Sequence, residues 1–149
     1  VMLAVQSRQG SSLRAFRRVM SDPSLTEPAL KMLVRVGLAG RAHVAAAELS
    51  HGERRRLEIA IALALCPRAF LFDEPMAGLG PEGSKSLVGL LNDLRQEAPI
   101  LLVEHDMDAV FALADRISVL VYGRIIATGG VSEIRSNAEV RRAYFGEHL

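Results

Sequence analysis

The chain has 149 residues, which suits one domain or a part of a larger one. Half of the residues are apolar and the formal net charge is +1, a balance that supports a packed core and argues against a dedicated nucleic-acid-binding protein. The single cysteine, Cys66, cannot form an internal disulfide, which fits a reducing cytoplasm. No apolar run approaches the roughly 18 to 20 residues that cross a bilayer.

The first third of the chain, residues 1–48, is predicted to be mostly helical. The segment Thr26-Glu27-Pro28 predicts a helix start, because apolar residues follow it at helical spacing. Ser50 and Glu53 form an S-x-x-E capping box, which predicts the start of a helix that runs to Pro67. The chain begins directly on an apolar run without a signal peptide, as expected for a cut within a longer protein.

Strands and helices alternate in the remainder of the chain. Short apolar runs predict four strands, at residues 69–72, 100–103, 117–121 and 125–127. Leucines recur at helical spacing between the first two strands, at positions 87, 90, 91 and 94. Tyr122-Gly123 predicts a hairpin between the last two strands, and Ser132 and Asn137 are predicted to cap two short terminal helices.

This alternation predicts the fold class. Helix and strand alternation from residue 50 to residue 121 implies an α/β protein with a parallel sheet and helices on both faces. The helical residues before it predict a separate lobe. We therefore expect two parts, a helical lobe of residues 1–65 and an α/β part of residues 66–149.

The segment Ser50-His51-Gly52-Glu53 is a candidate anion-binding site. A helix N-terminus presents unpaired N–H groups and about half a positive charge, so it attracts negative groups. Gly52 allows a phosphate to approach the backbone closely, and the Ser50 hydroxyl can donate to one of its oxygens. For an S-x-x-E pattern alone, a plain helix cap is the more common interpretation.

Two carboxylates and a histidine follow the first two predicted strands. Asp73-Glu74 ends an apolar strand, and His105 comes just after the next one. Ligands of open parallel sheets bind at the carboxyl ends of the strands, where these side chains are expected to lie. Each signal by itself is weak, because a strand often ends in acidic residues and a lone histidine is often a surface residue. Their order and spacing after Ser50 are typical of one protein family, which makes the combination specific.

Taken together, Leu49-Ser50-His51-Gly52-Glu53, Asp73-Glu74 and His105 resemble the motifs of ABC transporter ATP-binding subunits. The resemblance implies that Ser50, His51, Gly52 and Glu53 form the signature motif, which contacts the γ-phosphate of an ATP held by a partner subunit. It also implies that Asp73 orients Mg²⁺, that Glu74 is the general base for the attacking water, and that His105 is the switch histidine.

The chain departs from the family pattern at several positions. His51 and Glu53 replace residues of the usual L-S-G-G-Q sequence. Gly78, Leu79 and Gly80 occupy the place of the D-loop, but Gly80 replaces the usual Asp or Asn, which predicts weaker communication between two nucleotide sites. No G-x-x-x-x-G-K-[ST] sequence occurs, and neither lysine follows a glycine.

We therefore interpret the chain as the C-terminal part of an ABC ATPase subunit. The implied fold is a partial P-loop NTPase (RecA-like) parallel sheet with an N-terminal helical lobe, the signature subdomain. The segment alone is predicted to be inactive, because the phosphate-binding loop is absent from it. The implied ligands are ATP and Mg²⁺.

The C-terminal third indicates the class of transporter. Residues 104–110 and the ending E-x-x-x-x-Y-x-G-E at residues 139–147 resemble the ATPases of branched-chain amino acid importers, although urea and lipopolysaccharide transporters share this ending. The implied partners are a second ATPase subunit, head to tail, and membrane permease subunits, with no nucleic acid and no transmembrane segment in the chain itself. The expected location is cytoplasmic, peripheral at the inner face of the cell membrane.

Two other classes of function remain open from the sequence. One is a non-catalytic interaction module that donates its signature motif to a partner's nucleotide. The other is an ABC ATPase of DNA repair or chromosome structure, which the absence of coiled coils and of a clustered basic surface disfavours.

Overall fold

A computed structural model describes residues 1–10 and 21–144 of the chain. The chain divides into two compact units, Val1–Val103 and Glu104–Leu149. This division falls later than residue 65, and the boundary expected there for a helical lobe stays a prediction. Within the described ranges, every helix is too short or too polar to cross a bilayer.

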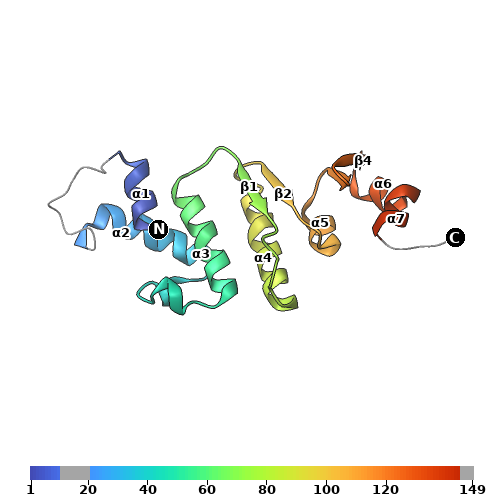
Figure 1. Cartoon of the computed structure of the whole chain (residues 1–149). Helices are drawn as coiled ribbons and strands as arrows, with labels where there is room; N and C mark the ends of the chain where they lie inside the picture. The colour runs from blue at the N-terminus through green and yellow to red at the C-terminus, as the bar shows by residue number, and fades with distance from the viewer. Residues whose placement is uncertain (11–20, 145–149) are drawn as a thin grey trace. The chain divides into compact units, whose positions relative to one another are not determined.

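The order of elements follows the alternation expected from the sequence (Figure 1). The first unit contains α1 (Met2–Arg8), α2 (Pro23–Arg35), α3 (His51–Ala64), β1 (Phe70–Asp73), α4 (Pro81–Leu94) and β2 (Ile100–Val103). The second unit contains α5 (Met107–Leu113), β3 (Ile117–Val121), β4 (Arg124–Gly129), α6 (Val131–Ser136) and α7 (Ala138–Tyr144). Two parts of the sequence predictions lie outside the described residues, namely 11–20 of the helical third and the Gly146-Glu147 end of the terminal motif.

Helix α2 begins earlier than predicted, at Pro23 rather than near Thr26. The Asp22 side chain caps it by accepting the Ser24 N–H at 3.0 Å, and Pro23 at the first helical position needs no N–H partner. Pro28 therefore lies inside the helix, where it cannot donate to the carbonyl of Ser24. Gln9 Nε2 donates to that carbonyl at 3.0 Å, so the acceptor that Pro28 leaves open is satisfied by α1's C-cap residue.

The three N-terminal helices pack around a small apolar cluster. The buried residues of this cluster come from α1, α2 and α3, and they are Val5, Leu25, Ala29 and Ala64. Helix α3 starts and ends as the capping box and Pro67 predict, with Ser50 as its N-cap. The cluster therefore holds the C-terminal end of α3, through Ala64, against α1 and α2. The N-terminal end of α3 lies outside this cluster.

Strands β1 and β2 are parallel, as the helix–strand alternation predicts. Phe70 lies opposite Ile100, and Asp73 lies opposite Val103. Helix α4 connects them and buries Leu87, Leu91 and Leu94, three of the four leucines that predicted it. The parallel pairing places the carboxyl ends of both strands at one edge.

The second unit is built around an antiparallel hairpin. Strands β3 and β4 pair with each other and with no other strand of residues 1–10 and 21–144. Tyr122 and Gly123 form the turn with φ values of 46° and 75°, the left-handed pair that a two-residue hairpin turn requires. The core of this unit contains Ile117, Val119, Ile134 and Val140.

One of the two predicted terminal caps is wrong. Gly130, not Ser132, is the N-cap of α6, because the Glu133 side chain reaches back to accept the Gly130 N–H at 2.8 Å. Asn137 does cap α7, since its Oδ1 accepts the N–H groups of Glu139 and Val140 at 2.9 and 3.1 Å.

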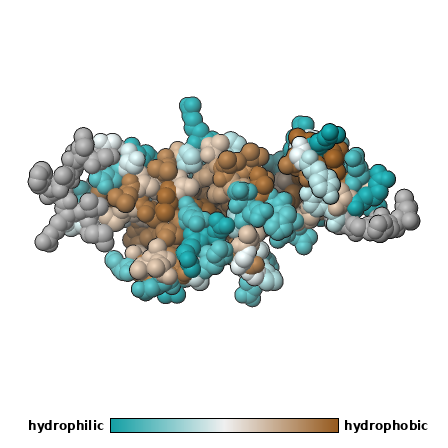
Figure 2. Space-filling model, viewed as in Figure 1, coloured by the Kyte–Doolittle hydropathy of each residue, from teal (hydrophilic) through white to brown (hydrophobic). Residues whose placement is uncertain are grey.

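One face of the β1–β2 pair is exposed, which differs from the expectation of helices on both faces. Leu71 and Leu101 are paired across the strands and are 71 % and 63 % exposed, and Val103 is 51 % exposed beside them. Apolar surface is also apparent in this part of the chain in Figure 2. Contiguous apolar surface of this kind favours association.

We expect the 149-residue chain to self-associate through this face. Leu71→Thr combined with Leu101→Thr should shift the chain toward monomer in sedimentation velocity, because threonine keeps β propensity and removes apolar area. Leu3→Thr, at a leucine on α1 that is 75 % exposed, is the matched control and should leave the association unchanged. A wild-type chain that sediments as a monomer would contradict the expectation.

Candidate functional site

The N-terminus of α3 is capped by a reciprocal pair of hydrogen bonds. Ser50 Oγ accepts the Glu53 N–H at 3.3 Å, and Glu53 Oε2 accepts the Ser50 N–H at 2.8 Å. The capping box predicted from the sequence is therefore present with both of its bonds. It fixes the direction in which the first turn of α3 presents its N–H groups.

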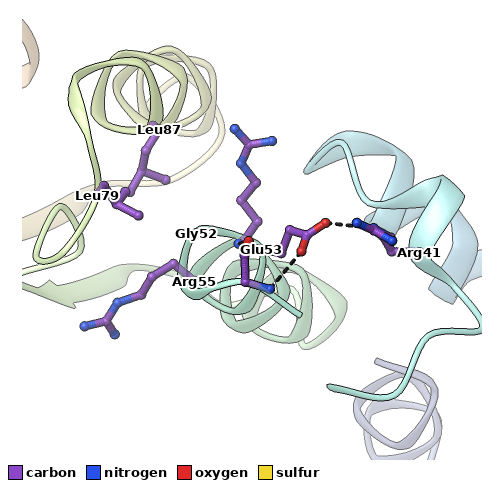
Figure 3. Close-up of a pocket in the computed structure, with 9 residues that line it drawn as sticks. Arg41, Gly52, Glu53, Arg55, Leu79 and Leu87 are labelled. Carbon is purple, nitrogen blue, oxygen red and sulfur yellow. Dashed lines mark hydrogen bonds and ion pairs between the residues drawn. The ribbon is translucent and has the colours of Figure 1, made fainter. Parts of the chain in front are cut away.

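Glu53 is held a second time by Arg41. Arg41 Nε donates to Glu53 Oε1 at 2.8 Å, and Figure 3 shows the two side chains meeting beside the first turn of α3. The hydrogen bond from the Ser50 N–H and then the contact with Arg41 lower the pKa of the Glu53 carboxyl. The carboxylate charge is thus matched by a guanidinium at the helix start.

A pocket of about 360 Å³ opens beside this helix start. It is lined by Arg41, Ser50, Gly52, Glu53, Arg55, Arg56, Leu79, Gly83 and Leu87. Three arginines and one glutamate therefore line a single cavity, and the helix dipole adds positive potential to it. An anion such as a phosphate fits this charge better than a cation does.

The arginines of the pocket are oriented by further contacts. Arg55 pairs with Glu58 one turn along α3, at 3.0 Å. Arg56 Nη2 donates to Ser86 Oγ on α4 at 2.8 Å, which joins the two helices that border the pocket. Arg41 and Arg55 lie on opposite sides of the helix start in Figure 3.

The predicted D-loop residues lie against the first turn of α3. Leu79 lines the pocket, and a Cβ on Gly52 would come within 3.3 Å of Leu79 Cδ2. His51 Nε2 lies 3.0 Å from the carbonyl oxygen of Ala77. The structure thus brings together two segments that the sequence analysis selected separately.

Asp73 and Glu74 stand at the carboxyl end of β1, and both are exposed. The Glu74 N–H donates to the carbonyl oxygen of Val103 at 2.9 Å, which extends the pairing one residue beyond β1. Glu74 has a φ of 44°, a left-handed conformation that is uncommon for a residue with a side chain and that clusters at functional sites.

The donor set at Asp73 fits Mg²⁺. This ion prefers oxygen ligands, keeps several waters and is usually held by one or two carboxylates together with substrate phosphates. Among the described residues, no three His, Cys, Asp or Glu side chains gather into a larger metal-binding group. One exposed carboxylate at a strand end is consistent with that mode of binding.

His105 belongs to the second unit, so its role beside Glu74 stays a prediction. Its side chain is 70 % exposed, and its N–H donates to Glu104 Oε2 at 3.1 Å. Asp106 caps α5 by accepting the N–H groups of Asp108 and Ala109. The histidine therefore stands between a strand end and a helix start, as predicted.

Sequence reasoning missed Arg41 and Gly83. Arg41 lies in a short 3₁₀ turn, and nothing in its surroundings predicts a contact with Glu53, 12 residues away. Gly83 is in the first turn of α4, where nothing in the sequence indicates a contact with the preceding loop. A Cβ at that position would lie 3.3 Å from Leu79 Cβ, so the missing side chain makes room for the loop.

Two family models match the chain. One, described as ABC transporter, matches residues 4–77. The other, described as Branched-chain amino acid ATP-binding cassette transporter, matches residues 124–149. The first covers the capped start of α3 and the carboxylates after β1, and the second covers the C-terminal segment from β4 onward.

Curated relatives point in the same direction. The chain is 43 % identical over 135 residues to the high-affinity branched-chain amino acid transport ATP-binding protein LivG of Salmonella typhimurium, covering 89 % of this chain and 52 % of that protein. It is 41 % identical over 135 residues to the high-affinity branched-chain amino acid transport ATP-binding protein BraF of Pseudomonas aeruginosa, covering 89 % of this chain and 52 % of that protein. The chain thus spans about half the length of these relatives.

Solved structures of ATP-binding cassettes have the same fold. The ADP conformation of MJ1267, an ATP-binding cassette of an ABC transporter, matches with a TM-score of 0.78 and 27 % identity, covering 98 % of this chain and 61 % of that one. A nucleotide-free ATP-binding cassette matches with a TM-score of 0.78 and 28 % identity, covering 98 % and 62 %. The α/β fold is therefore that of a partial P-loop NTPase.

Acid should loosen the start of α3. The pKa of Glu53 is lower in the folded chain than in the unfolded chain. The ionised carboxylate therefore stabilises the fold fully above the ordinary glutamate pKa of about 4.3, and this stabilisation is lost as the pH falls through the lowered pKa. Glu53→Gln keeps an acceptor for the Ser50 N–H but carries no charge at any pH. The stability advantage of the wild type over Glu53→Gln, measured by denaturant unfolding from pH 7 to pH 3, should therefore shrink in acid. An advantage that stays constant over this range would contradict the assignment.

Proposed function

Because this chain belongs to the ATP-binding subunits of ABC transporters, we propose that it works within an importer ATPase for branched-chain amino acids. The observation that carries the proposal is the capped start of α3, where Ser50 and Gly52 border a pocket rich in guanidinium groups. The match of the C-terminal residues to a branched-chain amino acid cassette model and the names of the curated relatives support the substrate class.

The proposal divides the chain between two nucleotide sites. Ser50, His51, Gly52 and Glu53 serve the ATP held by a second subunit, where the helix dipole and the N–H groups of α3 stabilise the γ-phosphate. Gly78, Leu79 and Gly80 lie beside them and contribute to the surface between the two subunits. The head-to-tail arrangement of the two subunits follows from this division.

The carboxylates serve the nucleotide of the same subunit. Bound Mg²⁺ would neutralise phosphate charge, with Asp73 holding it through water. Glu74 orients the attacking water and accepts its proton as the general base. His105 orients the water and the γ-phosphate from the start of α5.

The remaining partners are membrane permease subunits, which would hold the chain at the inner face of the cell membrane. Solute specificity then lies outside this chain, because the proposal assigns every site residue to ATP or to Mg²⁺. The competing function is a non-catalytic module that donates only the start of α3 to a partner's nucleotide.

The 149-residue chain alone should neither bind ATP tightly nor hydrolyse it. It contains no G-x-x-x-x-G-K-[ST] sequence, whose backbone amides and lysine are the main ligands of the β- and γ-phosphates in this class of ATPase. Calorimetric titration with Mg-ATP tests this. Micromolar affinity together with turnover would show that the chain supplies its own phosphate ligands.

In a complete subunit that also carries a phosphate-binding loop, substitutions of the two carboxylates should have different effects. Glu74→Gln should preserve ATP affinity while turnover falls by roughly 10²- to 10⁴-fold, the usual cost of losing a general base. His105→Ala should likewise keep affinity. Asp73→Asn should weaken the Mg²⁺-dependent binding itself, and Gly52→Asp should leave binding to the single subunit intact while blocking turnover.

The control for this series is Glu27→Gln, an exposed carboxylate on α2 outside the pocket. It should change neither affinity nor rate. Loss of ATP binding to the single subunit in both Glu74→Gln and Gly52→Asp would refute the assignment of the base and of the opposite subunit's site. A wild-type rate in Glu74→Gln would show that Glu74 is not the general base.

A further inference from the structure

His51 connects the start of α3 to the loop that follows the two carboxylates. Its Nε2 lies 3.0 Å from the carbonyl oxygen of Ala77, across 26 residues of sequence. A carbonyl oxygen can only accept a hydrogen bond, so Nε2 is the donor and carries the proton. The contact is formed within the first unit and requires no second chain.

Close packing surrounds this hydrogen bond. Gly78 has a φ of 73°, and a Cβ there would lie 3.0 Å from His51 Nε2. On the other side of the loop, Leu79 packs where Gly52 and Gly83 have no side chains, and a Cβ on either glycine would come within 3.3 Å of it. Gly52 and Gly78 thus allow the loop to lie directly on the first turn of α3, and Gly83 makes room for Leu79 at the start of α4.

We propose that His51 is a positioning residue, which holds the Ala77–Leu79 loop on the first turn of α3. Ser50 and Gly52 line the pocket, but His51 is not among its described lining residues. The imidazole therefore acts on the loop and leaves the phosphate-facing side of the helix start to its two neighbours.

The contact links two functions that the proposed mechanism assigns to different nucleotides. The loop begins three residues after Glu74, so a displacement of the α3 start toward a partner's nucleotide is transmitted to the segment beside the general base. The Asp or Asn that usually stands at the position of Gly80 is absent from this loop. The hydrogen bond from His51 is therefore a second connection between the loop and a nucleotide site. The catalytic consequence rests on the proposed function, whereas the hydrogen bond itself does not.

Hydrogen exchange on the 149-residue chain tests the contact directly. The Ala77 N–H donates to the carbonyl oxygen of Glu74, and the Leu79 N–H donates to that of Met76, both at 3.1 Å. In His51→Ala their exchange should become about fivefold faster, as expected for the loss of one hydrogen bond. His51→Gln, whose amide N–H₂ reaches about as far as Nε2, should restore most of the protection.

His43→Ala removes an exposed histidine from the loop before α3 and is the matched control, with no change expected at Ala77 or Leu79. Unchanged loop exchange in His51→Ala would overturn the proposal. Because exchange is followed residue by residue, the effect is read independently of any change in global stability, which α4 amides report.

Steady-state kinetics on the complete ATPase subunit then tests the consequence. His51→Ala should lower kcat about fivefold with the KM for Mg-ATP unchanged, and His51→Gln should recover the rate. A raised KM that glutamine does not rescue would instead assign His51 to direct phosphate contact and overturn the positioning role. An inactive wild-type subunit would refute the proposed function while the exchange result stands.

Discussion

The candidate site depends on the fixed start of α3. A helix N-terminus attracts anions only if its first turn is ordered and its acidic residues do not cancel the positive potential. Here Glu53 is turned back to the Ser50 N–H and is matched by Arg41, so its charge is neutralised locally. The N–H groups of the first turn and the remaining guanidinium groups then determine the potential of the pocket.

The second constraint is the parallel pairing of β1 and β2. Four residue pairs, from Phe70–Ile100 to Asp73–Val103, bring the ends of both strands to one edge. Glu74 adds one more hydrogen bond to Val103 and turns into a left-handed conformation there. That turn redirects the chain into the loop that packs on α3, so the carboxylates and the helix start are connected by a short and tightly packed segment.

Local signals in the sequence predicted most of the fold. The capping box at Ser50, the hairpin joined at Tyr122-Gly123 and the apolar strands were all predicted correctly, because each depends on neighbouring residues. The start of α2 was not, since Pro28 is tolerated inside the helix only because Gln9 supplies a donor from another helix.

The predicted site residues were chosen on family resemblance, and the structure adds contacts that no sequence pattern encodes. Arg41 reaches Glu53 and His51 reaches Ala77 through the fold rather than through local spacing. Such contacts depend on how loops lie against helices, which side-chain chemistry alone does not determine.

The most direct test of the account is a mixing experiment with two inactive forms of the complete subunit. One carries Gly52→Asp and the other carries Glu74→Gln, and the ATPase rate is measured for each alone and for the mixture. If Gly52 serves the partner's nucleotide and Glu74 serves its own, a mixed dimer contains one site with both residues intact, and mixing restores part of the activity. If Gly52 and Glu74 of one subunit instead serve the same nucleotide, every site in the mixture lacks one of them. A mixture as inactive as its components would therefore contradict the account.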